Sequence, residues 1–220
     1  MHDARAEALS PFSERGFRHL AQAELSLTAP VADPGAPDTP SDFDLSPDLI
    51  PEAERAPLTA AAVLIPIVAR AELTVLLTQR TEGLPHHAGQ IAFPGGRMEA
   101  TDRDPIATAL REAREEIGLD PRFVEPLGYL DAYRTGTGFR IFPVVSLVRE
   151  GFTLKLDARE VADAFEVPLA IVMVSQNHKR ETIDWSGFPL NSYVMQFGNR
   201  KIWGATAIIL RNLYERIYRS

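Results

Sequence analysis

The chain has 220 residues, a formal net charge of −7 at pH 7 and no cysteine, so general nucleic-acid binding is disfavoured, and disulfides, thiolate metal ligands and cysteine nucleophiles are excluded. Its apolar fraction of 45% suffices for a sizeable core, and its length fits one large domain or one domain with an appendage. No apolar run reaches the ~18 residues that a membrane span needs, and the N-terminus lacks the apolar core of a signal peptide, so we expect a cytoplasmic protein that does not bind membranes.

Residues 1–56 are expected to form an appendage, not a domain. An amphipathic helix is predicted over residues 13–27, and its apolar side comprises Phe17, Leu20, Ala21, Leu25 and Leu27. Residues 28–57 contain seven prolines and many Asp and Ser residues, which indicates a linker or a wrapping arm. Such an arm needs a surface to lie on, either its own body or a second copy, so a homodimer remains one of two arrangements.

From residue 57 to residue 220 we expect one α/β domain, in which a mixed sheet lies between helices. Two strands joined by a short link, 61–68 and 73–78, are predicted to form a hairpin. The further predicted strands are 91–93, 124–133, 139–148, 152–156, 161–167, 182–185, 193–197 and 201–203. The predicted helical segments are 105–117, a short turn over 168–174, and 205–218, which should turn Ile208, Ile209, Leu213 and Ile217 inward.

The helix predicted over residues 105–117 has clear ends. Asp104 can cap its N-terminus, Pro105 suits the first helical position, and Gly118 can adopt the left-handed conformation that ends a helix. On a helical wheel of ~100° per residue, one apolar stripe should face a core; it comprises Ile106, Ala109, Leu110, Ala113 and Ile117.

Three glutamates, Glu112, Glu115 and Glu116, fall on an arc beside this stripe. Glu112 and Glu116 are one turn apart, and like charges at that spacing destabilise a bare helix by roughly 0.2–0.5 kcal/mol. Arg111 lies four residues before Glu115 and can pair with one carboxylate. The remaining carboxylates offer the oxygen ligands that Mg²⁺ or Mn²⁺ prefers, and a solvated acidic helix face is the alternative.

The segment from Gly96 to Leu119 resembles the motif of the Nudix hydrolases, written G-x5-E-x7-R-E-U-x-E-E-x-G-U with U an aliphatic residue. Residues 111–119 match its second half, with Ala113 at the first aliphatic position. The first half differs, because Asp102 replaces the glutamate and eight residues, not seven, precede Arg111.

This departure resembles one branch of the family, the coenzyme A diphosphatase-like proteins. Their upstream pattern, L-L-T-x-R-[S/A]-x3-R-x3-G-x3-F-P-G-G, is matched in register by residues 76–80, Gly89 and residues 93–96. Pro85, however, stands where the branch has an arginine that could meet a substrate phosphate, and His86 or His87 would have to compensate. The resemblance covers roughly residues 60–218 and does not include the N-terminal arm.

The resemblance implies a Nudix-type α/β/α sandwich that hydrolyses the pyrophosphate of coenzyme A or acyl-coenzyme A to 3′,5′-ADP and (acyl-)4′-phosphopantetheine. Mg²⁺ or Mn²⁺ would neutralise the phosphates and activate water. The expected metal ligands are Glu112, Glu115, Glu116 and the backbone carbonyl of Gly96. The expected catalytic residues are Glu115, Arg111 and Glu112, and the expected substrate contacts are Arg80, Arg97 and His87.

Several roles stay open at this point. The catalytic base is Glu115 or a carboxylate on a distant loop, such as Glu160 or Glu166. Arg134 and Arg140 are weaker candidates for the site. The aromatic residues Tyr133, Phe139 and Trp203 are expected to be core residues, and stacking on an adenine ring is the alternative role. Asp102 is expected to cap or turn its loop and is not expected to be a ligand.

Two other functions compete with coenzyme A hydrolysis. The same chemistry admits ADP-ribose, a dinucleotide cofactor or a nucleoside triphosphate as the substrate, and the proline at position 85 keeps these alternatives open. A non-catalytic module that binds a nucleotide is the other class. All three motif glutamates are present, which favours an enzyme.

Overall fold

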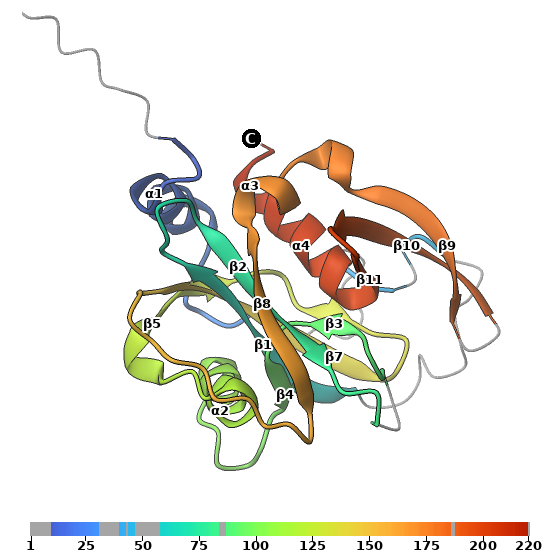
Figure 1. Cartoon of the computed structure of the whole chain (residues 1–220), viewed down its shortest axis with the longest axis horizontal. Helices are drawn as coiled ribbons and strands as arrows, with labels where there is room; N and C mark the ends of the chain where they lie inside the picture. Colours follow the sequence, from blue (N-terminus) through green and yellow to red (C-terminus); the bar gives the residue numbers. More distant parts are fainter. Residues whose placement is uncertain are drawn as a thin grey trace, which may run out of the picture.

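The computed structural model describes residues 10–30, 40–42, 44–46, 58–83, 87–185 and 188–219. Within these residues, eight strands form a mixed sheet (Figure 1). β1 (Thr59–Val68) pairs in parallel with β7 (Phe139–Val148) along its whole length and antiparallel with β2 (Thr74–Arg80), so the predicted hairpin is confirmed. The other strands of this sheet are β3 (Ile91–Ala92), β4 (Gly95–Arg97), β5 (Val124–Tyr129), β6 (Tyr133–Arg134) and β8 (Val161–Pro168).

Each face of the main sheet carries its own apolar core, because successive side chains of a strand point to opposite faces. From β1, Ala62 and Leu64 join the core that includes helix α2 (Pro105–Ile117). Ile65 and Ile67 join the core that includes helix α4 (Gly204–Ile217). The sheet therefore lies between helices, and the predicted α/β class with an α/β/α sandwich is confirmed (Figure 1).

A second, three-stranded antiparallel sheet lies beside α4 (Figure 1). Its strands are β9 (Lys179–Trp185), β10 (Phe188–Phe197) and β11 (Arg200–Trp203), which extend the three late strands predicted from the sequence. The predicted turn over 168–174 contains α3 (Leu169–Val172) and is followed by a 3-10 turn, η4 (Ser175–Asn177). No helix among the described residues is long and apolar enough to span a membrane.

The predicted strand over residues 152–156 is wrong. This segment runs extended past the end of α2, where the backbone N–H of Lys155 donates to the carbonyl of Ile117 at 2.8 Å and that of Asp157 to the carbonyl of Glu116 at 2.8 Å. The last carbonyls of a helix lack hydrogen-bond donors within the helix, and the backbone N–H groups of this segment supply two such donors. The alternating apolar residues that suggested a strand instead pack on the α2 core. The predicted strand 124–133 is also interrupted, so that β5 and β6 are separate and η3 (Pro121–Phe123) precedes β5.

Part of the N-terminal appendage packs on the body of its own chain. Helix α1 (Glu14–Glu24) begins after Ser13, whose side chain accepts a hydrogen bond from the N–H of Gly16, and it buries Phe17 and Ala21 completely. The predicted extension to Leu27 is wrong, because the helix ends at Glu24 and Leu27 is 62% exposed. The domain boundary at residue 56 and the homodimer remain predictions.

Candidate active site

The helix that carries the three glutamates has the predicted ends. The side chain of Asp104 accepts a hydrogen bond from the N–H of Ala107 at 2.8 Å, and Gly118 has a φ of 68°, the left-handed conformation that favours glycine. Ala109, Ala113 and Ile117 are buried against the sheet. The glutamates therefore lie beside this buried stripe, where α2 packs on β4.

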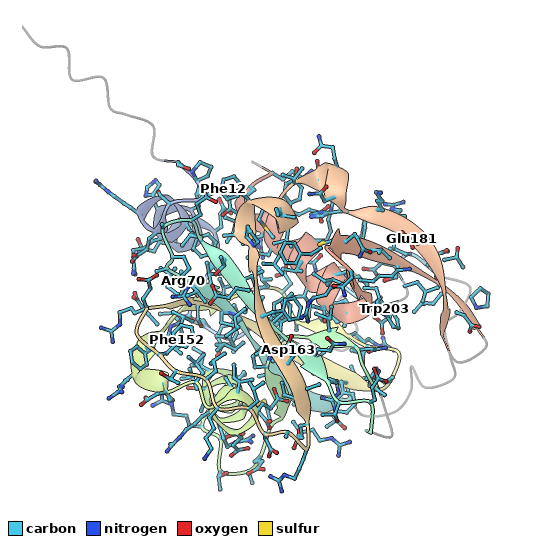
Figure 2. All side chains as sticks on the ribbon, viewed as in Figure 1. Phe12, Arg70, Phe152, Asp163, Glu181 and Trp203 are labelled. Carbon is cyan, nitrogen blue, oxygen red and sulfur yellow. The ribbon has the colours of Figure 1, made fainter. Side chains whose placement is uncertain are left out.

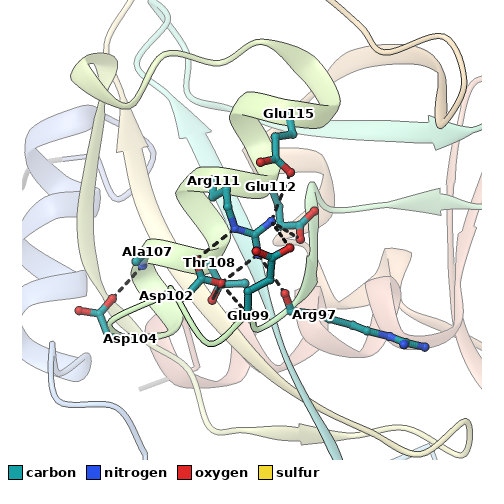
Figure 3. A network of polar contacts seen from close by, with 9 residues as sticks. All are labelled: Arg97, Glu99, Asp102, Asp104, Ala107, Thr108, Arg111, Glu112 and Glu115. Atoms are coloured by element: carbon teal, nitrogen blue, oxygen red, sulfur yellow. Dashed lines mark hydrogen bonds and ion pairs between the residues drawn. The ribbon is translucent and has the colours of Figure 1, made fainter.

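Arg111 is the centre of a polar network at the start of this region (Figure 3). Its guanidinium donates two hydrogen bonds to the Asp102 carboxylate, at 3.1 and 2.9 Å, and contacts Glu112 at 2.8 Å and Glu115 at 3.2 Å. It also donates to the backbone carbonyl of Arg97 at 3.0 Å. Arg111 thus holds two of the three glutamates and ties the helix to β4.

The principal partner of Arg111, Asp102, was not predicted as such. Its carboxylate also accepts hydrogen bonds from the N–H of Glu99 and the hydroxyl of Thr108, both at 2.9 Å. Its side chain is only 6% exposed, and the hydrogen bonds from Arg111 hold the pKa of this carboxyl well below its usual range. Asp102 therefore turns the loop, as expected, and orients the arginine as well.

The three glutamates lie in different surroundings. Glu116 is 6% exposed and accepts a hydrogen bond from the N–H of Gly95 at 3.2 Å. Burial, followed by repulsion from Glu112, raises its pKa to about 7. Burial also raises the pKa of Glu112, whose side chain is 17% exposed, whereas Glu115 is 60% exposed. Glu116 is thus buried, Glu112 is half-buried and Glu115 is exposed.

The glycine pair of β4 lets the backbone approach this cluster closely. A Cβ atom on Gly96 would lie 2.5 Å from the carboxylate of Glu112, and a Cβ atom on Gly95 would lie 2.4 Å from the carbonyl oxygen of Ala62. Contacts this short do not occur, so neither position accepts a side chain without movement of its neighbours.

The described residues contain no preformed group of three His, Cys, Asp or Glu side chains arranged around a common point. The donors nevertheless fit a hard divalent cation. The half-buried Glu112 and the buried Glu116 repel one another and have raised pKa values, and Arg111 contacts only the first of them. Oxygen donors of this kind are the ligands that Mg²⁺ and Mn²⁺ prefer.

A pocket of about 680 Å³ borders the glycine pair, and none of the three glutamates is among its lining residues. Its wall contains Gly95, Gly96 and the three predicted substrate contacts, Arg80, Arg97 and His87. The Nε atom of Arg80 is buried and has no hydrogen-bond partner among the described residues, while its charge acts on Glu116. The guanidinium of Arg97 lies 5.2 Å from the ring centre of Phe139, and Nδ1 of His87 lies 2.9 Å from Oε1 of Gln90. The structure therefore brings the three predicted contacts to one pocket.

The aromatic candidates divide between core and pocket. Tyr133 is fully buried, as expected for a core residue. Trp203, labelled in Figure 2, and Phe139 are only partly buried and line the pocket, so their expected place in the core is corrected. Phe139 is the first residue of β7 and Trp203 is the last residue of β11. Both rings therefore lie at strand ends that border the pocket, and not in the middle of the sheet.

Other candidates lie away from the pocket or near the glutamates. Glu166 pairs with Arg70 at 2.6 Å on the surface of β8, while Glu160 acts electrostatically on Glu112 and Glu116. Arg134 and Arg140 are not among the pocket-lining residues. Pro85 and His86 lie outside the described residues.

One pocket residue, Asp42, was missed. It belongs to the proline-rich arm, which has no periodicity and no motif to single it out. Only the docking of the arm on the body brings this carboxylate to the pocket.

Comparison with known proteins places this site in a family. The model of the NUDIX domain matches residues 58–200. A Yersinia enterocolitica protein described as an uncharacterized Nudix hydrolase, NudL, is 41% identical over 157 residues, which cover 71% of this chain and 80% of that protein. A MutT/nudix family protein from Enterococcus faecalis is similar in structure, with a TM-score of 0.46, 17% identity, and coverage of 78% of this chain and 65% of that one. DR0079 from Deinococcus radiodurans has a TM-score of 0.47 and 12% identity, covering 77% of this chain and 91% of that one. The chain belongs to the Nudix family, as a pyrophosphohydrolase of nucleoside diphosphate derivatives.

Proposed function

We propose that this enzyme hydrolyses the pyrophosphate of coenzyme A or acyl-coenzyme A, releasing 3′,5′-ADP and (acyl-)4′-phosphopantetheine. The observation that carries the proposal is the pocket of about 680 Å³, which borders the Gly95–Gly96 turn and has arginines in an otherwise largely apolar wall. A diphosphate at the turn would lie next to the α2 glutamates. The apolar wall suits the long uncharged pantetheine arm of such a substrate.

Divalent metal ions of the kind that Nudix hydrolases generally use would be held by Glu112 and Glu116, with Glu115 and the carbonyl of Gly96 as further ligands. A bound ion would neutralise phosphoryl oxygens and lower the pKa of a bound water. The burial of Glu116, the partial burial of Glu112 and the close approach of Gly96 to Glu112 support these ligands.

The remaining residues have roles that follow from their contacts. Arg80, with its unpartnered Nε, and Arg97 bind phosphate oxygens, and His87 contributes to substrate binding. Arg111 is a positioning residue, because it orients Glu112 and Glu115 and is itself held by Asp102. Glu115 is one candidate for the proton acceptor, and Glu160 is the alternative, since its charge acts on Glu112 and Glu116.

A panel of substrates tests this proposal. Coenzyme A, acetyl-coenzyme A, ADP-ribose and NADH are each incubated with the enzyme and Mg²⁺ or Mn²⁺, and the products are separated by chromatography. We expect 3′,5′-ADP from the first two substrates and loss of turnover by about 10²-fold or more in the E116Q variant. Hydrolysis of ADP-ribose far faster than of coenzyme A would refute the choice of substrate. Unchanged turnover in E116Q would remove Glu116 from the mechanism.

A further inference from the structure

Residues 40–42 and 44–46 of the N-terminal arm contact the body beside the pocket. The N–H of Arg134 donates to the carbonyl of Pro40 at 2.9 Å, and the N–H of Asp42 donates to the carbonyl of Arg134 at 3.1 Å. Farther along, Asn191 on β10 donates from its backbone N–H to the Ser46 hydroxyl and from its side-chain amide to the carbonyl of Leu45, both at 3.0 Å. The arm thus contacts both sheets, the main sheet through Pro40 and Asp42 and the three-stranded sheet through Leu45 and Ser46.

The Asp42 side chain is held in one orientation by the body. Its Oδ1 accepts a hydrogen bond from the hydroxyl of the fully buried Tyr133, and its Oδ2 accepts one from the N–H of Gly136 at 2.7 Å. Asp42 nevertheless keeps some exposed surface, and that surface lines the pocket. A carboxylate has about four acceptor positions, so after these two bonds it can still accept a hydrogen bond from a ligand.

Asp42 also brings a negative charge to the pocket. Burial raises the pKa of this carboxyl, while the hydrogen bonds from Tyr133 and Gly136 lower it. Among the described residues, the charges that act on it are those of His87 and Asp44, and no lysine or arginine is one of them. The charges that act on Glu116 are instead those of Glu112, Arg80 and Glu160. The pocket wall therefore includes Arg80, whose charge acts on Glu116, and Asp42, a carboxylate on which no arginine of the described residues acts.

We propose that Asp42 is a specificity-determining residue of the pocket: it accepts a hydrogen bond from an uncharged hydroxyl or amine of the substrate and disfavours a phosphate monoester at that place. This inference rests on the proposed function, since it concerns the substrate of the same site. It implies that coenzyme A is cleaved, but that a diphosphate substrate without the additional phosphate monoester is cleaved with a higher kcat/KM. Juxtaposed like charges in a partly buried site justify an expected preference of about tenfold.

The test compares kcat/KM for dephospho-coenzyme A and coenzyme A, which differ by one phosphate monoester. In the Asp42→Asn variant, the preference for dephospho-coenzyme A should fall by about tenfold, because Asn is isosteric and uncharged. Asp42→Glu, which keeps the charge, should retain the wild-type preference. Glu24→Gln is the matched control, since it removes one exposed charge of the same N-terminal segment at the end of α1.

An unchanged ratio in Asp42→Asn, with thermal unfolding like that of the wild type, would overturn the proposal. If Asp42→Asn does not fold, Asp42→Ser provides a second uncharged side chain for the same comparison. If the wild type cleaves neither coenzyme A nor dephospho-coenzyme A, the proposal that coenzyme A is the substrate is refuted, separately from the proposal on Asp42. The role of Asp42 is then decided by the same ratio for NADH and NADPH, which also differ by one phosphate monoester.

Discussion

The buried Glu116 should make the metal-free enzyme less stable as the pH rises. Its pKa in the folded state is about 7, against an ordinary value of 4.5, so the folded state binds the proton more tightly than the unfolded state does. Its contribution to stability is therefore fully present below pH 4.5 and is lost as the pH rises to about 7. The difference between these pKa values corresponds to about 3 kcal/mol of unfolding free energy.

The Glu116→Gln variant removes this titration and keeps an oxygen that can accept the hydrogen bond from Gly95. In urea unfolding with a chelator present, the variant should resemble the wild type at pH 4 and be more stable by about 3 kcal/mol at pH 8. Glu115→Gln, on the same helix and 60% exposed, is the control and should show no such gain. Addition of Mg²⁺ at pH 8 should stabilise the wild type, by about 2.7 kcal/mol at 100 times the dissociation constant, and should stabilise Glu116→Gln less. A stability difference between wild type and variant that is the same at pH 4 and pH 8 would refute the reasoning.

Three further predictions concern other residues around the glutamate cluster of α2. Gly96→Ala should lower activity by about 10- to 100-fold, because the new methyl group displaces the adjacent α2 carboxylate, whereas Gly83→Ala, which has open space around it, should retain activity in the same assay. Asp102→Asn should lower the free energy of unfolding by about 2 kcal/mol at pH 7, because the charged hydrogen bonds to Arg111 are lost. Because the pKa of Asp102 is lowered in the folded state, its stabilising effect decreases as the pH falls below 3.8, and the difference between variant and wild type should shrink there. Equal stability of the two proteins in urea at pH 7 would contradict this role. If Glu160 is the proton acceptor, Glu160→Gln should lower kcat by about 10²-fold or more, whereas Glu166→Gln, which changes a carboxylate paired with Arg70, should retain kcat. The reverse result would make Glu166 the proton acceptor.

The sequence predicted most of the fold where local signals and packing agree. The helix over residues 105–117 has a capping Asp104, a terminal Gly118 and an apolar stripe, and all three are found in the structure. The segment over residues 152–156 has strand-like alternation but no neighbouring strand, and its backbone serves the end of α2 instead. Alternation reports which side chains are buried, and it does not report where the backbone hydrogen bonds go.

The site divides in the same way. Spacing along one helix placed Glu112 beside Glu116, because neighbours on a helix follow from its 3.6-residue period. Asp42 could not be found in this manner, since its neighbours, Tyr133 and Gly136, lie more than 90 residues away and are met only when the arm docks. Contacts of this kind depend on tertiary structure alone.

Asp102 accounts for the departure of this chain from the family motif. Aspartate is one methylene shorter than glutamate, and the segment that leads to Arg111 is one residue longer. In the structure, this short carboxylate both receives the arginine fork and closes the turn from Glu99, so the longer segment and the shorter side chain together bring the anion to the arginine. The contacts of Asp102 therefore lie within its loop and on α2, and Asp102 is not among the residues that line the pocket. We therefore expect selection among diphosphate substrates to come from the pocket wall, which includes Arg80 and Asp42.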